Sequence, residues 1–171
     1  MKHIKLYNVI FPIWFLLFFP PVVFVTLLGN FIIDSLVVIA CFYVYKLANQ
    51  NINLKSFYKK SILKVWIFGF IADIIGAVLL LMIEGSGSTW GIPSKVITGI
   101  EFDPFRSTAA VIIIIFVMLI SAAFIFIFNY YNTFVKQIKN KKLRLKVAIT
   151  IAIITIPWTF LLPTKWFYHG L

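Results

Sequence analysis

Residues 108–128 read TAAVIIIIFVMLISAAFIFIF, a stretch of twenty-one residues without a single charge. A helix needs about 20 apolar residues to cross the roughly 30 Å of hydrocarbon in a lipid bilayer. The stretch has that length, and its apolar residues do not alternate with polar ones as the strands of a membrane β-barrel do. It therefore predicts a transmembrane α-helix over Thr108–Phe128.

The rest of the chain has the same apolar character. Of the 171 residues, 62% are hydrophobic and only 12% are charged, and the mean hydropathy is +1.02. A soluble domain of ordinary composition carries about 25% charged residues. We therefore expect an all-α protein, a polytopic bundle of transmembrane helices whose surroundings are the lipid bilayer. No small-x-small cleavage site follows the first apolar run, so we interpret it as an uncleaved span.

Five spans are expected, with four or six as alternatives. Only Gly29-Asn30 separates the first two, so we predict a tight external turn there, with Asn30 capping the second helix. In an alternative interpretation, Leu6–Phe19 is re-entrant or interfacial, and one long helix from Val22 to Tyr45 leaves four spans. The five expected spans are Leu6–Leu28, Phe31–Tyr45, Val65–Ile83, Thr108–Phe128 and Val147–Leu162.

Basic residues are distributed unevenly between the connecting segments. The residues before the first span, Lys46–Lys64 and Lys136–Lys146 together hold thirteen Lys or Arg and no acid. The opposite side holds three basic residues alongside the acids Glu84, Glu101 and Asp103. Because cytoplasmic loops are enriched in Lys and Arg, the N-terminus is predicted to be cytoplasmic and, with five spans, the C-terminus external. Topology thus explains the net charge of +11, and no nucleic-acid partner is expected.

Two connecting segments have features beyond topology. The basic segment Lys136–Lys146 could hold anionic lipid headgroups, at about 1 kcal/mol per charge, or dock an acidic protein, although topology alone also explains its composition. The external segment 84–107 begins with the flexible Gly85-Ser-Gly-Ser88 and continues with apolar residues such as Trp90 and Ile100. We expect this segment to lie on the outer membrane surface, with a ligand or partner contact as the alternative.

Two acids, Asp34 and Asp73, lie inside expected spans, where no Lys, Arg or His accompanies them. An ionisable group in hydrocarbon costs at least ~2.5–3.5 kcal/mol, so each acid is a candidate functional residue. Asp34 follows the presumed cap Asn30 by four residues and is expected near the outer boundary, as a structural acid at a helix N-terminus. Asp73 is expected close to the midplane, which places Asp34 roughly 10 Å nearer to water.

The surroundings of Asp73 suggest that it points at another helix. Gly69, Ala72, Asp73, Gly76 and Leu80 share one helix face by their spacing. Small residues let a neighbouring backbone approach closely, so this face is expected to pack on protein. The carboxyl of Asp73 would then form a simple interhelical hydrogen bond, carry a proton or ion, or contact a partner protein.

Catalytic and metal-binding motifs are missing from the sequence. There is no P-loop, no Gly-x-Ser-x-Gly and no His-Glu-x-x-His. The only cysteine, Cys41, excludes an internal disulfide and a cysteine-built metal site. We therefore expect no catalytic residues, no metal and no cofactor, and an enzyme is disfavoured.

The N-terminal region contains Lys5-Leu-Tyr-Asn-Val-Ile-Phe-Pro-Ile-Trp14, then Phe19-Pro-Pro21 and Asn30-Phe-Ile-Ile-Asp-Ser-Leu36. It resembles the N-terminal half of small uncharacterised multi-pass membrane proteins of Gram-positive bacteria. The resemblance covers the first 45 residues. It implies a bacterial cell membrane but no activity.

Three classes of function remain after these observations. The leading hypothesis is a non-enzymatic membrane subunit that contacts other membrane proteins or a second copy of itself. The alternative is a small transporter or substrate-binding subunit that uses Asp73 and Asp34 in a polar cavity. A lipid-modifying enzyme is the third class, disfavoured because the chain lacks a recognisable nucleophile, base or metal constellation.

Overall fold

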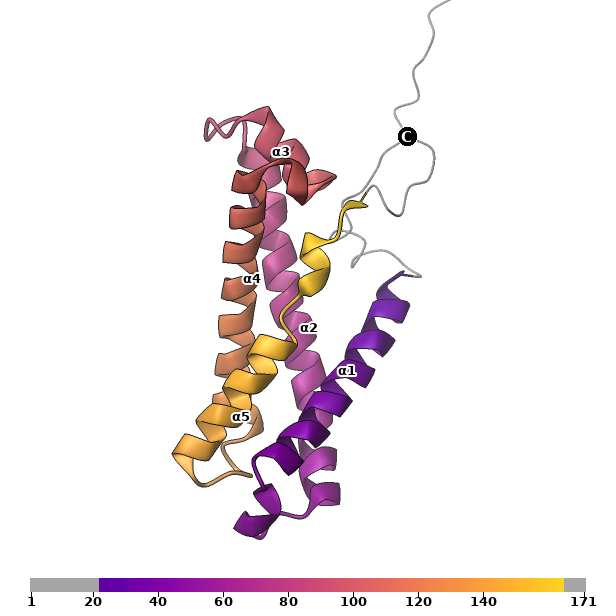
Figure 1. Cartoon of the computed structure of the whole chain (residues 1–171), viewed down its shortest axis with the longest axis vertical. Helices are drawn as coiled ribbons and strands as arrows, with labels where there is room; N and C mark the ends of the chain where they lie inside the picture. Colours follow the sequence, from indigo (N-terminus) through magenta and orange to yellow (C-terminus); the bar gives the residue numbers. More distant parts are fainter. Residues whose placement is uncertain (1–21, 165–171) are drawn as a thin grey trace, which may run out of the picture.

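The computed structural model describes residues 22–164, which form a bundle of long helices packed side by side (Figure 1). In this part of the chain, four helical segments are long and apolar enough to cross a membrane. The prediction of an all-α transmembrane bundle is confirmed. The principal helices are α1 (Val22–Val44), α2 (Leu54–Ser86), α4 (Thr108–Phe128) and α5 (Lys141–Ile154).

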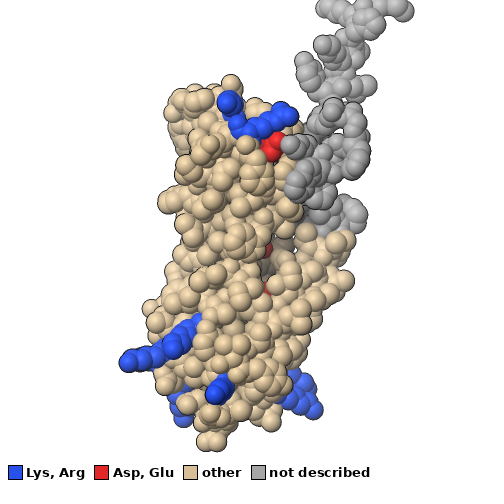
Figure 2. All heavy atoms as spheres, viewed as in Figure 1, with Lys and Arg blue, Asp and Glu red and all other residues tan. Residues whose placement is uncertain are grey.

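Successive spans run antiparallel because each connecting segment reverses the chain (Figure 1). At one end, the 3₁₀ turn η2 (Leu47–Gln50) joins α1 to α2, and the π-helical turn η4 (Asn129–Thr133) precedes the connection to α5. At the other end, α3 (Ser94–Glu101) and the 3₁₀ turn η3 (Pro104–Arg106) join α2 to α4. Lys and Arg side chains gather at the end that carries η2 and η4, at the bottom of Figure 2.

The outer surface of the bundle is apolar. Phe24 is 68% exposed, Leu36 62% and Phe116 63%. Contiguous exposed apolar surface of this kind is rare on soluble proteins. In a bilayer these side chains face lipid, so they need no further partner.

Helix α1 corrects the prediction for the first two spans. It passes through Gly29 and Asn30 without a break, so the predicted turn there is wrong. The residues expected as the separate spans Leu6–Leu28 and Phe31–Tyr45 share one helix from Val22 onward. In lipid, a break would leave backbone N–H and C=O groups unsatisfied, which outweighs the local turn preference of Gly-Asn. The earlier part of the first expected span, with Leu6–Phe19, lies outside the described residues, and the count of five spans stays a prediction.

Helix α2 extends well beyond the expected span Val65–Ile83. It starts after Asn53, whose side-chain oxygen accepts hydrogen bonds from the backbone N–H of Lys55 (2.9 Å) and Ser56 (3.3 Å). Its 33 residues correspond to about 50 Å at 1.5 Å per residue, against roughly 30 Å of hydrocarbon. The first three turns carry four lysines. These turns therefore lie at the membrane boundary and not in the apolar interior.

The last span is broken where a continuous helix was expected over Val147–Leu162. Helix α5 ends at Ile154, and a 3₁₀ turn, η5 (Trp158–Leu161), resumes after three non-α residues. Pro157 has no backbone N–H to donate, which disfavours continuation of the α-helix. The Thr155 hydroxyl donates to the Ile151 carbonyl at 2.8 Å and closes the last turn.

Buried side chains form two separate clusters along the bundle. The inner cluster, near η2 and η4, includes Val38, Phe57, Ala72, Ile125, Phe134, Ile151 and Ala152. The outer cluster, near α3, includes Ala77, Leu80, Val96, Ile100, Ile114, Met118 and Phe160.

Segment 84–107 was expected to be external and to lie on the membrane surface. Instead, α3 buries Val96 and Ile100 in the outer cluster, against the ends of the spanning helices. Trp90 and Phe105 remain exposed, at 59% and 65%. The buried apolar residues of this segment therefore close the end of the bundle that carries α3.

Candidate functional site

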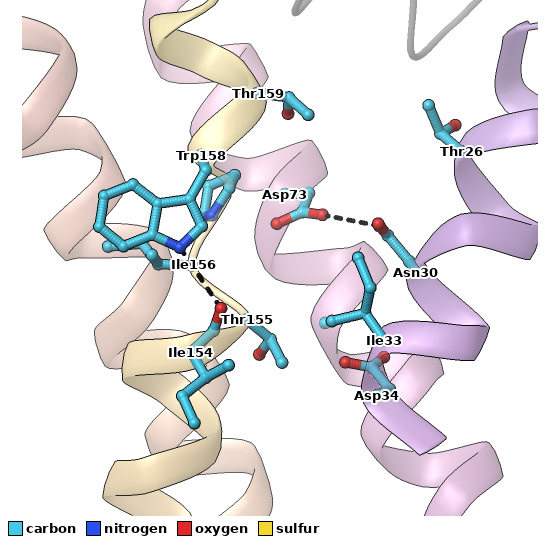
Figure 3. A pocket seen from close by; sticks show the side chains of 12 residues that line it. Thr26, Asn30, Ile33, Asp34, Asp73, Ile154, Thr155, Ile156, Trp158 and Thr159 are labelled. Atoms are coloured by element: carbon cyan, nitrogen blue, oxygen red, sulfur yellow. Dashed lines mark hydrogen bonds between the residues drawn. The ribbon is translucent and has the colours of Figure 1, made fainter. Parts of the chain in front are cut away.

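A cavity of about 110 Å³ lies between α1, α2 and the segment that joins α5 to η5 (Figure 3). It separates the inner cluster from the outer cluster: on α2, Ala72 belongs to the first, Ala77 to the second, and Asp73 stands between them. In Figure 2, acidic atoms are visible inside a hollow at mid-height. A cavity of this size with carboxyl, amide and hydroxyl groups in its wall has room for a few water molecules or a small ion.

Asp73 is the polar side chain that α2 contributes to the lining of this cavity. Its side chain is 7% exposed. One carboxyl oxygen, Oδ2, accepts a hydrogen bond from Asn30 Nδ2 at 3.4 Å, across the gap to α1 (Figure 3). The other oxygen, Oδ1, is buried without a hydrogen-bond partner among the described residues. A buried oxygen left in this state is expected to have a water, a proton or a ligand beside it.

Asp34 lines the same cavity from α1 and is 4% exposed. It lies twelve residues after Val22 and ten before Val44, in the middle of α1. The prediction of a structural acid near the outer boundary is therefore wrong, because the helix begins at Val22 and not at Asn30. Asp34 lies beside Gly69, where an added Cβ would stand 3.7 Å from the carboxyl oxygen Oδ2. Since Gly69 precedes Asp73 by one turn, the two acids differ in depth by about one helical turn, roughly 6 Å.

The two carboxyl groups are close enough for their charges to repel each other. Within residues 22–164, an ion pair joins Arg106 to Asp103 at 3.3 Å, next to α3. No Lys, Arg or His among the described residues lines the cavity, so neither cavity acid is neutralised by a basic side chain of this part of the chain. Two carboxylates sharing a poorly solvated site cannot both stay ionised without a compensating positive charge. The arrangement can therefore hold a proton or a cation.

The wall opposite the acids is the break in the last span, residues 154–159. Irregular backbone at membrane depth occurs where it is buried in protein or lines a cavity, because its polar groups need partners other than lipid. The Ile154 carbonyl accepts a hydrogen bond from Trp158 Nε1 at 3.3 Å, and the indole lies on the far side of the chain from the acids (Figure 3). A discontinuous spanning helix beside buried carboxyls is a common construction for ion sites in transporters.

The small residues of α2 have different neighbours at different depths. Ala72 is fully buried. A Cβ added to Gly76 would lie 2.8 Å from Phe160 Cε2 and would also collide with the Ser121 hydroxyl. Gly76 therefore permits close packing of α2 on α4 and η5, whereas Gly69 leaves space beside Asp34.

Sequence reasoning missed two parts of this site. Asn30 was assigned to a helix cap, yet its amide reaches Asp73. The break at residues 155–157 was not foreseen, although Pro157 inside an apolar span was a usable signal. Within residues 22–164, no three His, Cys, Asp or Glu side chains gather as a metal-ligand set.

Comparison of the chain with protein-family models, with curated proteins and with solved structures finds no match. The function is therefore argued from the geometry of the cavity.

Proposed function

We propose that this protein is a small membrane carrier that binds a proton or a small monovalent cation between Asp34 and Asp73. The observation that supports this most directly is the buried Oδ1 of Asp73, a residue that lines the cavity; this oxygen has no hydrogen-bond partner among the described residues. A second carboxyl in the same cavity adds negative charge that only a proton or a cation can offset. The volume of about 110 Å³ favours a small ion over a larger solute.

The proposal replaces the subunit role favoured by sequence alone. That role rested on a small-residue face expected to meet another helix. Helices of the same chain cover this face, because Asn30 of α1 reaches Asp73 and Phe160 of η5 lies against Gly76. A partner protein is not needed to account for either feature. The cavity, in contrast, is explained by a ligand.

Ion flux in reconstituted vesicles tests the proposal. Purified protein is placed in liposomes loaded with a pH-sensitive or Na⁺-sensitive dye, and a gradient is applied. Asp73→Asn and Asp34→Asn keep shape and hydrogen-bonding capacity but remove the titratable group, so each is expected to abolish flux while leaving a folded protein. Glu101→Gln, which removes a carboxyl outside the cavity, serves as the matched control and should leave flux unchanged.

Two results would count against the carrier. Unchanged flux in Asp73→Asn would show that its ionisation is not needed for transport. Release of a co-purifying membrane protein from Asp73→Asn, with no flux in the native protein, would favour the subunit role. Loss of flux in Glu101→Gln as well would point to general damage to the bundle.

We also propose that the protein lies in a bacterial plasma membrane with the basic segments in the cytoplasm. The positive-inside rule supports this orientation for Lys46–Lys64 and Lys136–Lys146. Because α1 would then enter from outside at Val22, a cytoplasmic N-terminus requires the residues before it to cross the membrane too. A C-terminus outside the cell follows from the same arrangement.

Cysteine labelling of intact cells tests this orientation. With the buried Cys41 replaced by Ala, a membrane-impermeant maleimide should label Ser94→Cys on α3 and should not label Ser56→Cys at the start of α2. His3→Cys should also stay unlabelled if the N-terminus is cytoplasmic. Labelling of Ser56→Cys without Ser94→Cys would invert the topology.

A further inference from the structure

A second pocket, of about 660 Å³, lies at the basic end of the bundle, between the start of α2 and the turn η4. It is separate from the cavity that holds Asp34 and Asp73. Its lining includes Lys60 and Lys64, one helical turn apart on α2, and Lys136 from the segment that follows η4. Three lysine side chains thus line one hollow.

No Asp or Glu side chain lines this pocket among residues 22–164. Lys60 and Lys64 stand four residues apart on a helix, where like charges repel each other. A pocket that collects three such groups is suited to an anion. The five acids of the whole sequence all lie elsewhere, in the mid-membrane cavity or near the outer end, at Asp34, Asp73, Glu84, Glu101 and Asp103.

A buried hydroxyl without a partner also faces this pocket. Thr133, the last residue of η4, is 1% exposed and lines the pocket, and its Oγ1 has no hydrogen-bond partner among the described residues. The turn that carries it is held in place by Gln137, whose Nε2 donates to the Ser61 hydroxyl at 3.0 Å and to the Thr133 carbonyl at 3.1 Å. The position of the hydroxyl is therefore fixed, and its hydrogen-bond donor is left for an acceptor that enters the pocket.

The level of the pocket in the membrane indicates the source of the anion. Lys64 directly precedes the apolar stretch that begins at Val65, and its neighbours Leu63 and Ile67 are 55% and 42% exposed toward lipid. The ammonium groups therefore lie at the level of phospholipid phosphates. The volume exceeds what a free phosphate needs and suits a phosphodiester with its alcohol groups. We propose that this pocket binds the phosphate headgroup of an anionic phospholipid, with Lys60, Lys64 and Lys136 as charge partners and Thr133 as hydrogen-bond donor.

The test compares two triple variants with the same loss of charge. The pocket variant carries Lys60→Gln, Lys64→Gln and Lys136→Gln, and the control carries Lys139→Gln, Lys141→Gln and Lys142→Gln, which are exposed and lie outside the pocket. Each protein is purified in neutral detergent and titrated with phosphatidylglycerol, and bound lipid is counted by native mass spectrometry. Affinity should fall by about fivefold per lysine, on the order of 100-fold, in the pocket variant, and should change much less in the control.

Thr133→Val separates a built site from diffuse attraction. This change keeps the shape of the side chain and removes a hydroxyl that has no partner among the described residues. The lipid-free protein should therefore keep its melting temperature, while affinity for phosphatidylglycerol should fall by roughly tenfold, as expected for a hydrogen bond to a charged group. Unchanged affinity in Thr133→Val would overturn the assigned hydrogen bond.

Two further results would overturn the proposed lipid site. Equal losses of affinity in the two triple variants would show that the lipid responds to charge alone and would overturn the pocket. Tighter binding of inorganic phosphate or glycerol 3-phosphate than of phosphatidylglycerol would assign the same phosphate site to a soluble ligand and overturn the lipid source. None of these results depends on whether the mid-membrane cavity carries ions.

Discussion

Gly69 and Gly76 stand on the same face of α2, two turns apart, yet their surroundings differ. A side chain at Gly76 would collide with Phe160 and Ser121, whereas one at Gly69 would meet only the Asp34 carboxyl at 3.7 Å. At the level of Gly76 the bundle is closed by an aromatic ring from η5. At the level of Gly69 the last span has lost its regular helix and a cavity remains. The spacing of small residues in the sequence identifies the face of α2 that packs on protein. The residues on the neighbouring helices determine whether a glycine on that face permits close contact or leaves space.

The largest effect is expected for Gly76→Leu. The added side chain cannot fit between α2, α4 and η5, and overpacking of this severity should lower the free energy of unfolding by about 3 kcal/mol. Val78→Leu is the matched control, since Val78 is 42% exposed to lipid on the same helix. Thermal unfolding in detergent, followed by size-exclusion chromatography, measures both. Equal melting temperatures for Gly76→Leu and Val78→Leu would contradict the close packing assigned to Gly76.

Gly69→Leu should affect the site more than the fold. The cavity of about 110 Å³ can accept most of the added side chain, so we expect a stability loss of only about 1 kcal/mol. Ion flux in liposomes should nevertheless disappear, because the side chain would occupy the space beside Asp34. If the Gly69→Leu protein were as unstable as the Gly76→Leu protein, the cavity would not be available to a side chain at position 69.

Alanine at the same two glycines sharpens the contrast. Gly76→Ala still places a Cβ 2.8 Å from Phe160 Cε2 and should lower stability by about 1–2 kcal/mol. Gly69→Ala meets ordinary contact distances and improves helix propensity, so stability should stay the same or rise by up to about 1 kcal/mol. The two melting temperatures should therefore shift in opposite directions relative to the unmodified protein. Melting temperatures that shift in the same direction would contradict the assignment of tight packing to Gly76 and open space to Gly69.

The smallest effect is expected for Gly29→Ala. Nothing lies within 4 Å of a Cβ at this position, and α1 is helical through it. Alanine should therefore raise the melting temperature slightly, in line with a gain of roughly 0.5–1 kcal/mol in helix propensity. A clear loss of stability would instead support the external turn that the sequence suggested at Gly29-Asn30.

The sequence allowed the helical class and much of the position of the spans to be predicted. The helix expected over Thr108–Phe128 coincides with α4, because a long uncharged run in lipid has few alternatives. The break of the last span was less accessible. Pro157 marks its position, but whether a proline kinks a helix or ends it depends on the neighbours that satisfy the freed backbone groups.

The candidate site was predicted only in part. Asp73 was recognised as an intramembrane acid beside small residues, and a cavity shared with Asp34 was weighed as an alternative. The depth of Asp34 was wrong because Gly29-Asn30 was interpreted with rules from aqueous proteins, where such a pair ends helices freely. The approach of Asn30 to Asp73 depends on the register of α1 against α2. Register is set by the packing of whole helices and leaves no local signal in the sequence.

The division of the core into an inner and an outer cluster has a mechanical consequence. The last span belongs to both, since Ile151 and Ala152 pack in the inner cluster and Phe160 packs in the outer one. Helices α2 and α4 also pass through both clusters but without a break, whereas the last span changes to irregular backbone at residues 155–157, at the wall of the acid-lined cavity. Because two unbroken helices fix the clusters relative to each other, a local movement at the cavity would be confined to the backbone of the last span and would leave both clusters in place.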